Sequence, residues 1–130
     1  MDIKELAVKY HDDGYNCAQA VLCSLSEYTE LDEKTALAIA AGFGGGLRSG
    51  EVCGAISGAV MALGMAFPFN DSTDTLAKDK IAELAKQCVA AAKEKFGCTN
   101  CSQLKGDKSN CSFYISEMTA IAEEMIKNNK

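Results

Sequence analysis

Residues 52–70 limit the fold of this chain more than any other stretch, because none of them carries a charged side chain. An uncharged stretch of this length lies either in a membrane, where a helix needs about 20 apolar residues, or inside a protein core. Ser57, Pro68 and Asn70 interrupt its apolar character, which favours the core. We therefore predict a buried central helix over residues 52–67 that ends before the proline.

Five further segments repeat apolar side chains at the 3.6-residue period of amphipathic helices. They cover Ile3–Tyr10, Ala18–Tyr28, Leu37–Ala41, Ala77–Phe96 and Tyr114–Met125. No run alternates with a period of two over enough residues to predict a strand. With 130 residues and 48% hydrophobic composition, the chain can bury one core without covalent cross-links. We predict an all-α fold, a compact bundle of about six helices in a single domain over residues 1–130.

Glycines fall at two places in this predicted fold. Gly54 and Gly58 lie in the central helix, where their missing side chains allow a second helix to approach closely. Residues 42–50 read GFGGGLRSG and lack the Lys and the Ser or Thr that complete a phosphate-binding loop. We interpret the first two glycines as packing positions and the second group as a tight turn beside Cys53.

The charge of the chain excludes one large class of partners. Its net charge is −5, and no cluster of Lys and Arg is present to bind phosphates, so we expect no nucleic-acid partner. Residues 1–14 are charged and amphipathic and lack the apolar stretch of an export signal. We therefore expect a cytoplasmic protein that does not insert into a membrane.

The chain has seven cysteines, three of them within residues 98–112. Cytosolic thiols are normally kept reduced, and clustered cysteines in that compartment more often bind metal or take part in redox chemistry than form permanent disulfides. Because seven is an odd number, the cysteines cannot all be paired within one chain. The question is therefore which of them are chemical and which are structural.

Two cysteines lie in the same local pattern, Asn-Cys-x-Gln, at residues 16–19 and 100–103. This pattern is a capping box, in which Asn is the N-cap and Gln is the third helical residue. Cys17 and Cys101 are therefore predicted to be the first residues of their helices.

Two more cysteines are placed similarly. Cys111 follows Asn110, which predicts a further N-cap, and Cys53 lies in the opening turn after the glycine-rich stretch. The N–H groups and the partial positive charge at a helix N-terminus stabilise a thiolate and lower the pKa of its thiol. Four thiols are therefore predicted where thiolates are favoured.

The other helical cysteines are predicted to be structural. Cys88 lies on the apolar stripe of its helix, where cysteine behaves as a small hydrophobic residue. Cys23 lies about 240° around its helix from Cys17, so the two do not share a face. We interpret Cys88 as a core residue and Cys23 as a residue on the flank of its helix.

Cys98 and Cys101 form a Cys-x-x-Cys pair, a spacing found in both redox dithiols and metal sites. Cys98 is therefore either an accessory thiol that resolves Cys101 or a loop residue beside the site. His11, the single histidine, is interpreted as a solvated residue at a helix end, because no motif recruits it as a ligand.

Several of these stretches together resemble one protein family. They are GYNCAQAV at 14–21, CGAISG at 53–58, FGCTNCSQLKGDK at 96–108 and the later Cys111. The order and separation of these stretches resemble the redox-active C_GCAxxG_C_C family, which is helical and of similar length. The resemblance implies that its four cysteines are Cys17, Cys53, Cys101 and Cys111, the same four that the capping argument selects.

Three functions remain open from the sequence. In the first, the four cysteines carry thiol–disulfide or electron-transfer chemistry, which would make the chain a thiol–disulfide oxidoreductase-like protein acting on a redox partner or a small-molecule thiol. In the second, the same four cysteines bind Zn²⁺ or an iron–sulfur cluster as a Cys₄ ligand set. In the third, the chain is a non-catalytic interaction module. The third ranks lowest, because four N-terminal placements are improbable by chance. The sequence does not decide between the first two, and we favour the first, which requires no cofactor.

Overall fold

The computed structural model describes residues 1–104 and 111–130. Its elements are α1 (Ile3–Asp12), α2 (Cys17–Ser24), α3 (Ser26–Thr29), α4 (Glu33–Ala40), the short turn η1 (Gly46–Gly50), α5 (Gly54–Ala66), α6 (Thr75–Phe96), α7 (Cys101–Leu104) and α8 (Cys111–Asn129). Within the described residues there is no strand, only an isolated antiparallel bridge between Val52 and Asn100. The predicted all-α fold is therefore confirmed.

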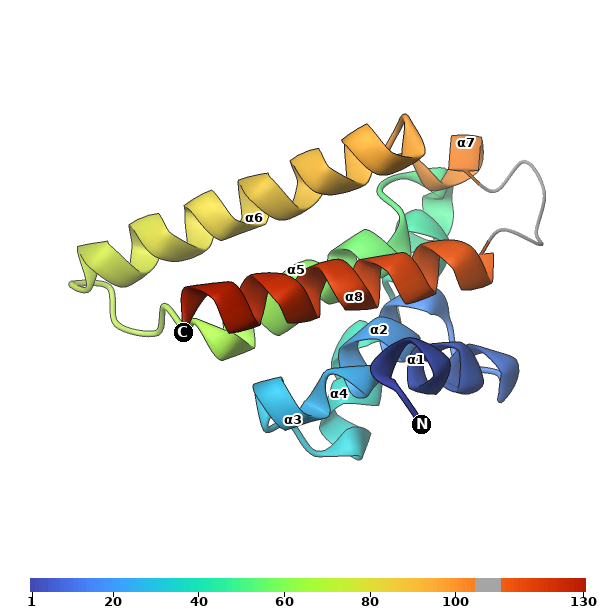
Figure 1. Ribbon diagram of the computed structural model, residues 1–130, viewed down its shortest axis with the longest axis horizontal. Helices are drawn as coiled ribbons and strands as arrows, with labels where there is room; N and C mark the ends of the chain where they lie inside the picture. The colour runs from blue at the N-terminus through green and yellow to red at the C-terminus, as the bar shows by residue number, and fades with distance from the viewer. Residues whose placement is uncertain (105–110) are drawn as a thin grey trace.

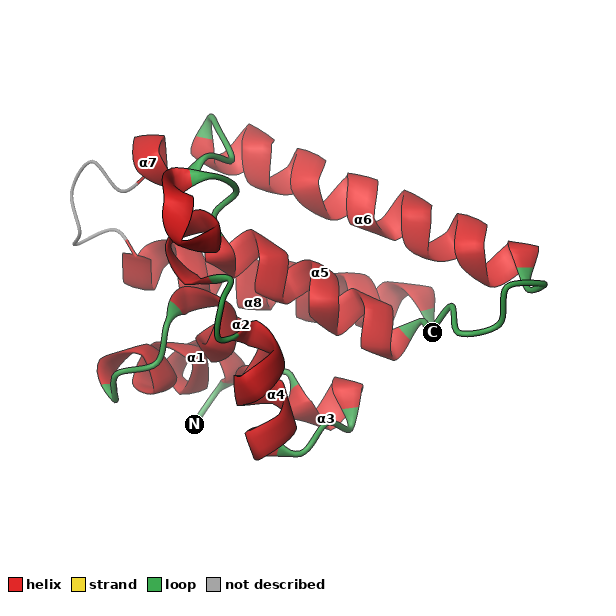
Figure 2. Cartoon of the chain, turned by 180° about the vertical axis from the view of Figure 1, so that it is seen from behind, coloured by secondary structure: helices red, strands yellow, loops and turns green. Residues whose placement is uncertain are grey.

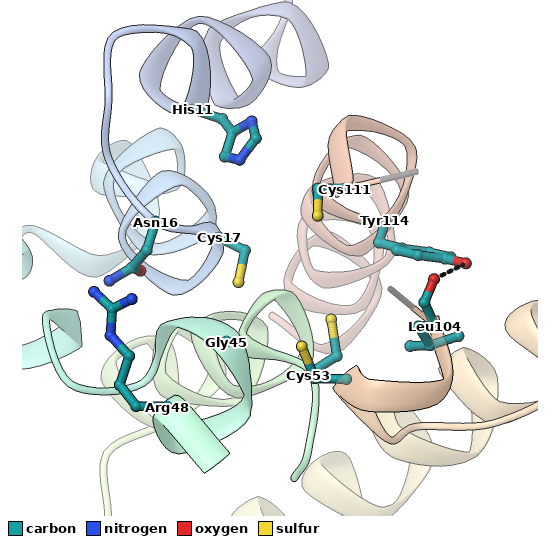
Figure 3. A pocket seen from close by; sticks show the side chains of 10 residues that line it. His11, Asn16, Cys17, Gly45, Arg48, Cys53, Leu104, Cys111 and Tyr114 are labelled. Atoms are coloured by element: carbon teal, nitrogen blue, oxygen red, sulfur yellow. Dashed lines mark hydrogen bonds between the residues drawn. The ribbon is translucent and has the colours of Figure 1, made fainter. Parts of the chain in front are cut away.

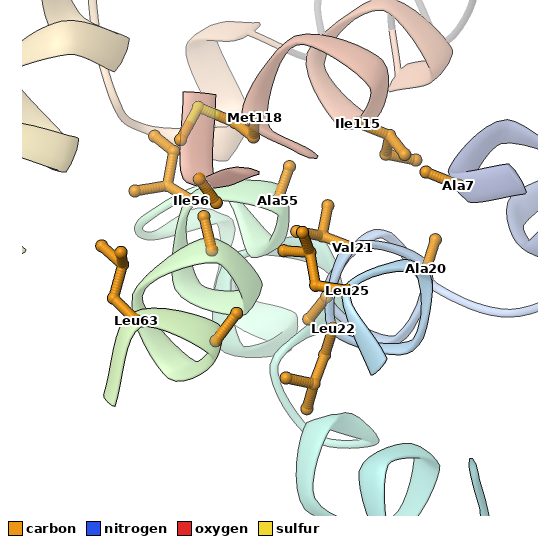
Figure 4. Close-up of a cluster of buried hydrophobic side chains, with 14 of the residues drawn as sticks. Ala7, Ala20, Val21, Leu22, Leu25, Ala55, Ile56, Leu63, Ile115 and Met118 are labelled. Atoms are coloured by element: carbon orange, nitrogen blue, oxygen red, sulfur yellow. The ribbon is translucent and has the colours of Figure 1, made fainter. Parts of the chain in front are cut away.

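Helix α5 is the centre of the bundle. It packs against α2, α8 and α6, and Figures 1 and 2 show α1, α3 and α4 on one side of it and α6 on the other. Ile56 and Leu63 of α5 are fully buried, and Ile56 lies near Met118 of α8 (Figure 4). The predicted buried central helix is confirmed, with its first turn at Gly54 because Val52 is exposed and bridged to Asn100.

Two glycines of α5, Gly54 and Gly58, explain how closely α2 approaches it. A Cβ added at Gly58 would lie 2.7 Å from the carbonyl oxygen of Ala18. A Cβ added at Gly54 would lie 2.9 Å from the carbonyl oxygen of Phe43 and would overlap the sulfur of Cys17. Neither position has room for a side chain, which confirms the packing interpretation.

The apolar stripe that predicted one helix from Ala18 to Tyr28 is divided into α2 and α3. Helix α2 ends at Ser24, whose hydroxyl donates to the Val21 carbonyl oxygen at 2.8 Å. Such a bond back to the preceding turn competes with the backbone ladder. The Leu25 N–H then bonds to Leu22 in a tighter turn, and α3 begins one residue later.

The long helix α6 has clear signals at both ends. The Asp74 side chain accepts from the Ala77 N–H at 3.0 Å, and Gly97 ends the helix in the left-handed conformation, with a φ of 85°. Along its buried face lie Leu84, Cys88 and Ala92. No helix in the described part of the chain is both long and apolar enough to cross a membrane.

Candidate functional site

Four cysteines from four separate parts of the sequence line one pocket of about 270 Å³ (Figure 3). They are Cys17, Cys53, Cys101 and Cys111. The fold therefore brings together the four residues that the sequence selected. Cys17 and Cys111 are half-buried, whereas Cys53 and Cys101 are 5% and 7% exposed.

Cys17 is held at the first position of α2 by the predicted capping box, which is confirmed. The Asn16 side chain accepts from the Gln19 N–H at 2.9 Å, and the Gln19 side chain accepts from the Asn16 N–H at 3.0 Å. The amide groups of both side chains also donate, to the carbonyl oxygens of Ala41 and Leu37 respectively. The same two residues therefore cap α2 and join it to the α4 region.

A short pairing of backbone segments fixes Cys53 relative to Cys101. The Cys53 N–H donates to Thr99 at 2.8 Å, and the Cys101 N–H donates to Glu51 at 2.6 Å, on either side of the bridge between Val52 and Asn100. Side chains alternate between the two faces of paired segments, so those of Cys53 and Cys101 leave on the same face. This face is the one that lines the pocket.

The cap of α7 differs from the prediction in its detail. Asn100 does precede the helix, but its side chain accepts from the N–H and hydroxyl of Ser102. The Gln103 N–H, which the predicted capping box would bond to the Asn100 side chain, instead donates to the Asn100 carbonyl oxygen at 3.1 Å. The N-cap predicted for Cys111, Asn110, lies outside the described residues.

The glycine-rich stretch forms a left-handed turn beside the cysteines. Gly45, Gly46, Leu47 and Arg48 have consecutive φ values of 64°, 63°, 60° and 59°. A Cβ at Gly46 would lie 2.8 Å from Cβ of Cys101, so a glycine is required there by contact as well as by conformation. The predicted tight turn is confirmed, and it lies against Cys101 as well as preceding Cys53.

The thiols of Cys17 and Cys53 interact directly. The Cys53 thiol donates a hydrogen bond to the Cys17 sulfur, and the backbone N–H groups of Gly45, Ala18 and Cys17 itself also favour the Cys17 thiolate. Together they lower the pKa of Cys17 to about 6, against the opposing effect of burial. The same hydrogen bond, together with burial, raises the pKa of Cys53. At neutral pH Cys17 is therefore mainly a thiolate, whereas Cys53 keeps its proton.

The remaining described cysteines lie outside this pocket. Cys88 is fully buried, and burial raises its pKa to about 11, as the core interpretation predicts. Cys23 is only 2% exposed and belongs to the core, so its interpretation as a flank residue is wrong. Its pKa is also raised to about 11, by burial and then by Glu33. Cys98 packs half-buried against the core, and its role as a resolving thiol stays a prediction.

Three residues of the pocket were not selected from the sequence. His11 lies at a helix end, as predicted, but it is half-buried in the pocket lining, which the sequence did not indicate. The sequence feature that could have indicated this is the position of His11 in the last turn of α1, because only a short connection separates that turn from Cys17.

Tyr114 lies one turn after Cys111, and its hydroxyl donates to the Leu104 carbonyl oxygen at 3.2 Å. Arg48 extends from the left-handed turn (Figure 3).

A metal ion would require several His, Cys, Asp or Glu side chains to converge. Among residues 1–104 and 111–130, no group of three or more His, Cys, Asp or Glu residues is arranged to hold one. The metal alternative therefore stays a prediction from the sequence. Metal analysis and an absorption spectrum of protein purified without oxygen test it directly.

A family model described as "Putative redox-active protein (C_GCAxxG_C_C)" matches residues 15–125. The chain belongs to this family. No curated protein and no solved structure gives a match. In this member of the C_GCAxxG_C_C family, the CGAISG element at 53–58 combines two tasks: Cys53 enters the pocket, while Gly54 and Gly58 let α2 approach closely enough for Cys17 to reach it.

Proposed function

We propose that this protein is a cytosolic redox protein that performs thiol–disulfide exchange, with Cys17 as the attacking thiol and Cys53 as the resolving thiol. The observation that carries the proposal is that Cys17 and Cys53 line the same pocket, where the Cys53 thiol is the largest influence that lowers the pKa of Cys17. The two residues differ in access, because Cys17 is half-buried whereas Cys53 is only 5% exposed. An incoming disulfide therefore meets Cys17 first.

The surroundings of Cys17 suit it to attack. With its pKa lowered to about 6 by Cys53 and the neighbouring N–H groups, Cys17 is mainly a thiolate at neutral pH. The thiolate is the reactive form in exchange, and a thiol whose pKa lies near the ambient pH attacks most effectively. Cys53 keeps its proton until the second step.

The exchange proceeds in two steps. The Cys17 thiolate attacks one sulfur of the substrate disulfide, forms a mixed disulfide, and releases the other substrate sulfur as a thiolate. This thiolate takes the Cys53 proton, and the Cys53 sulfur then attacks the sulfur of Cys17. A Cys17–Cys53 disulfide forms, and the second substrate thiolate leaves and is protonated by water. The two protein thiols thus give two electrons to the substrate disulfide.

Cys101 and Cys111 are assigned to the return of the pair to its reduced form. They line the same pocket, and Cys101 leaves the backbone on the same face as Cys53. Their two thiols reduce the Cys17–Cys53 disulfide by a second exchange and become oxidised themselves. An external dithiol then closes the cycle.

Peptide mapping tests the proposal. The reduced protein is treated with one equivalent of 2-hydroxyethyl disulfide in the absence of oxygen, quenched with acid, alkylated and digested. We expect a Cys17–Cys53 bridge in the wild type and no exchange in Cys17→Ser, while the core variant Cys88→Ala reacts as the wild type does. A Cys98–Cys101 bridge as the first product would overturn the assignment and support Cys98 as the resolving thiol.

A further inference from the structure

The lining of the cysteine pocket differs in charge from the rest of the protein. The chain has 18 acidic residues and a net charge of −5. None of the described residues that line the pocket is Asp or Glu, whereas Arg48 and His11 are both among them. The lining of this pocket therefore carries no carboxylate although the protein as a whole is acidic, and this distribution of charge favours the binding of an anion in the pocket.

Arg48 is placed unusually for a surface arginine. It has a φ of 59°, a left-handed conformation that is unfavourable for a residue with a Cβ. Its guanidinium lies at the pocket beside Asn16, on the same side as Cys17 (Figure 3). The ion pairs found among the described residues do not include it. Strain of this kind is typical of functional positions.

The size of the pocket limits what can enter. Its volume of about 270 Å³ lies just below the range of pockets for drug-sized ligands. Cys53 and Cys101 are almost fully shielded, so a group must enter the pocket to approach them. A small molecule meets this requirement more readily than a disulfide on the surface of a folded protein.

We propose that the substrate of this site is a small anionic disulfide, such as one formed from an amino-acid-sized acidic thiol, and that Arg48 binds its carboxylate. A guanidinium suits this task because its planar N–H groups match the two oxygens of a carboxylate. The sulfur of the bound molecule then faces Cys17. Arg48 is in this way a specificity-determining residue, and the inference rests on the proposed exchange chemistry.

Two alkylating reagents of similar size isolate the role of Arg48 from the exchange itself. Iodoacetate is anionic and iodoacetamide is neutral, and both react with the thiolate, so the ratio of their rates cancels any change in the pKa of Cys17. We expect the iodoacetate-to-iodoacetamide ratio at Cys17, relative to a small model thiol, to fall about fivefold in Arg48→Gln. Peptide mapping confirms that Cys17 is the residue alkylated.

Two variants serve as controls. Arg48→Lys keeps the positive charge and is expected to keep most of the ratio. Leu47→Gly changes the neighbouring residue, which is exposed and has the same left-handed backbone. It removes a comparable amount of strain and leaves the guanidinium in place, so its ratio should equal that of the wild type. An unchanged ratio in Arg48→Gln, or an equal loss in Leu47→Gly, would overturn the role of Arg48.

Exchange with small disulfides separates this inference from the proposed function. Dithiodiglycolate is anionic, 2-hydroxyethyl disulfide neutral and cystamine cationic. In Arg48→Gln we expect the rate with dithiodiglycolate to fall about fivefold, the neutral rate to change by less than about twofold, and the cationic rate to rise. Equal changes with all three would overturn the inference and leave the exchange function standing. No exchange with any of them in the wild type would overturn the function, while the alkylation ratio would still decide whether Arg48 attracts anions.

Discussion

Cys17 and Cys88 are both helical and both largely shielded from water, but their surroundings shift their pKa values in opposite directions. Cys17 receives hydrogen bonds from a second thiol and from backbone N–H groups at the start of α2, and its pKa falls to about 6. Cys88 lies in the middle of α6, where the backbone N–H groups are already used by the helix, and burial raises its pKa to about 11. Burial alone therefore does not determine the reactivity of a cysteine; the nearby donors decide it.

The largest expected effect is in the reactivity of these two thiols. At pH 7 the thiolate fractions of Cys17 and Cys88 differ by about 10⁴-fold, and burial slows Cys88 further. Mass spectrometry of peptides after timed iodoacetamide treatment should show Cys17 reacting first, with a half-maximal rate near pH 6. In denaturant the two rates should become equal. Equal rates in the folded protein would remove the argument from helix position.

The next effect concerns the approach of α2 to α5, which brings Cys17 to Cys53. In Gly54→Ala the new methyl group meets the Cys17 sulfur and the Phe43 carbonyl, and we expect a loss of about 2–3 kcal/mol in the free energy of unfolding. Gly64→Ala is the matched control on the same helix, because a Cβ there meets nothing within 4 Å. It should raise stability by about 0.5–1 kcal/mol. Urea denaturation measures both, and similar losses in the two variants would contradict the packing argument.

A smaller effect is expected in the dependence of stability on pH. The pKa of Cys17 is lower in the folded protein than in the unfolded chain, so its contribution is complete above about pH 9 and is lost as the pH falls to about 6. Below about pH 8 Cys53 adds little slope, because its raised pKa leaves it protonated in the folded state and it is mainly protonated in the unfolded state too. We expect the free energy of unfolding to rise by about 2 kcal/mol from pH 6 to pH 8 in the wild type. The same titration of Cys17→Ser should be flat in this region, apart from changes caused by other groups.

The smallest effect isolates the hydrogen bond between the two pocket thiols. Cys53→Ala removes the donor to Cys17, so the pKa of Cys17 should rise and its alkylation at pH 6.5 should slow about fivefold. Cys53→Ser keeps a donor at the same position and should lose much less. The pH profile of iodoacetamide alkylation gives the pKa in each variant. If Cys53→Ala leaves the pKa of Cys17 unchanged, the N–H groups alone account for the low pKa.

The sequence predicted those parts of the molecule that depend on local pattern. The buried helix around Ile56, the capping box around Cys17 and the core position of Cys88 follow from periodicity and from the chemistry of helix ends. Each depends on residues within a few positions of one another. That Cys17, Cys53, Cys101 and Cys111 form one set was implied by the resemblance to a family, because helix caps alone do not say which helix ends meet.

The parts that were missed depend on tertiary packing. His11 was interpreted as solvated because no motif lies beside it, yet the turn between α1 and α2 brings it to the pocket. Cys23 was placed on a flank because only its angle to Cys17 was considered, whereas its own helix is covered on several sides by α1, α4, α5 and α8. Arg48 gave no signal, since a left-handed backbone is unexpected at a residue other than glycine.

The two backbone hydrogen bonds on either side of Val52 and Asn100 also close the intervening residues, 53–99, into a loop. The chain leaves this junction along α5 and returns to it along α6, and the two helices are connected at the opposite end of the bundle (Figure 1). The entropy of closing such a loop grows only slowly with its length. Insertions in the connection at residues 67–74 should therefore leave the register of Cys53 against Cys101 unchanged. The same insertion at residues 49–52 would separate the two cysteines directly.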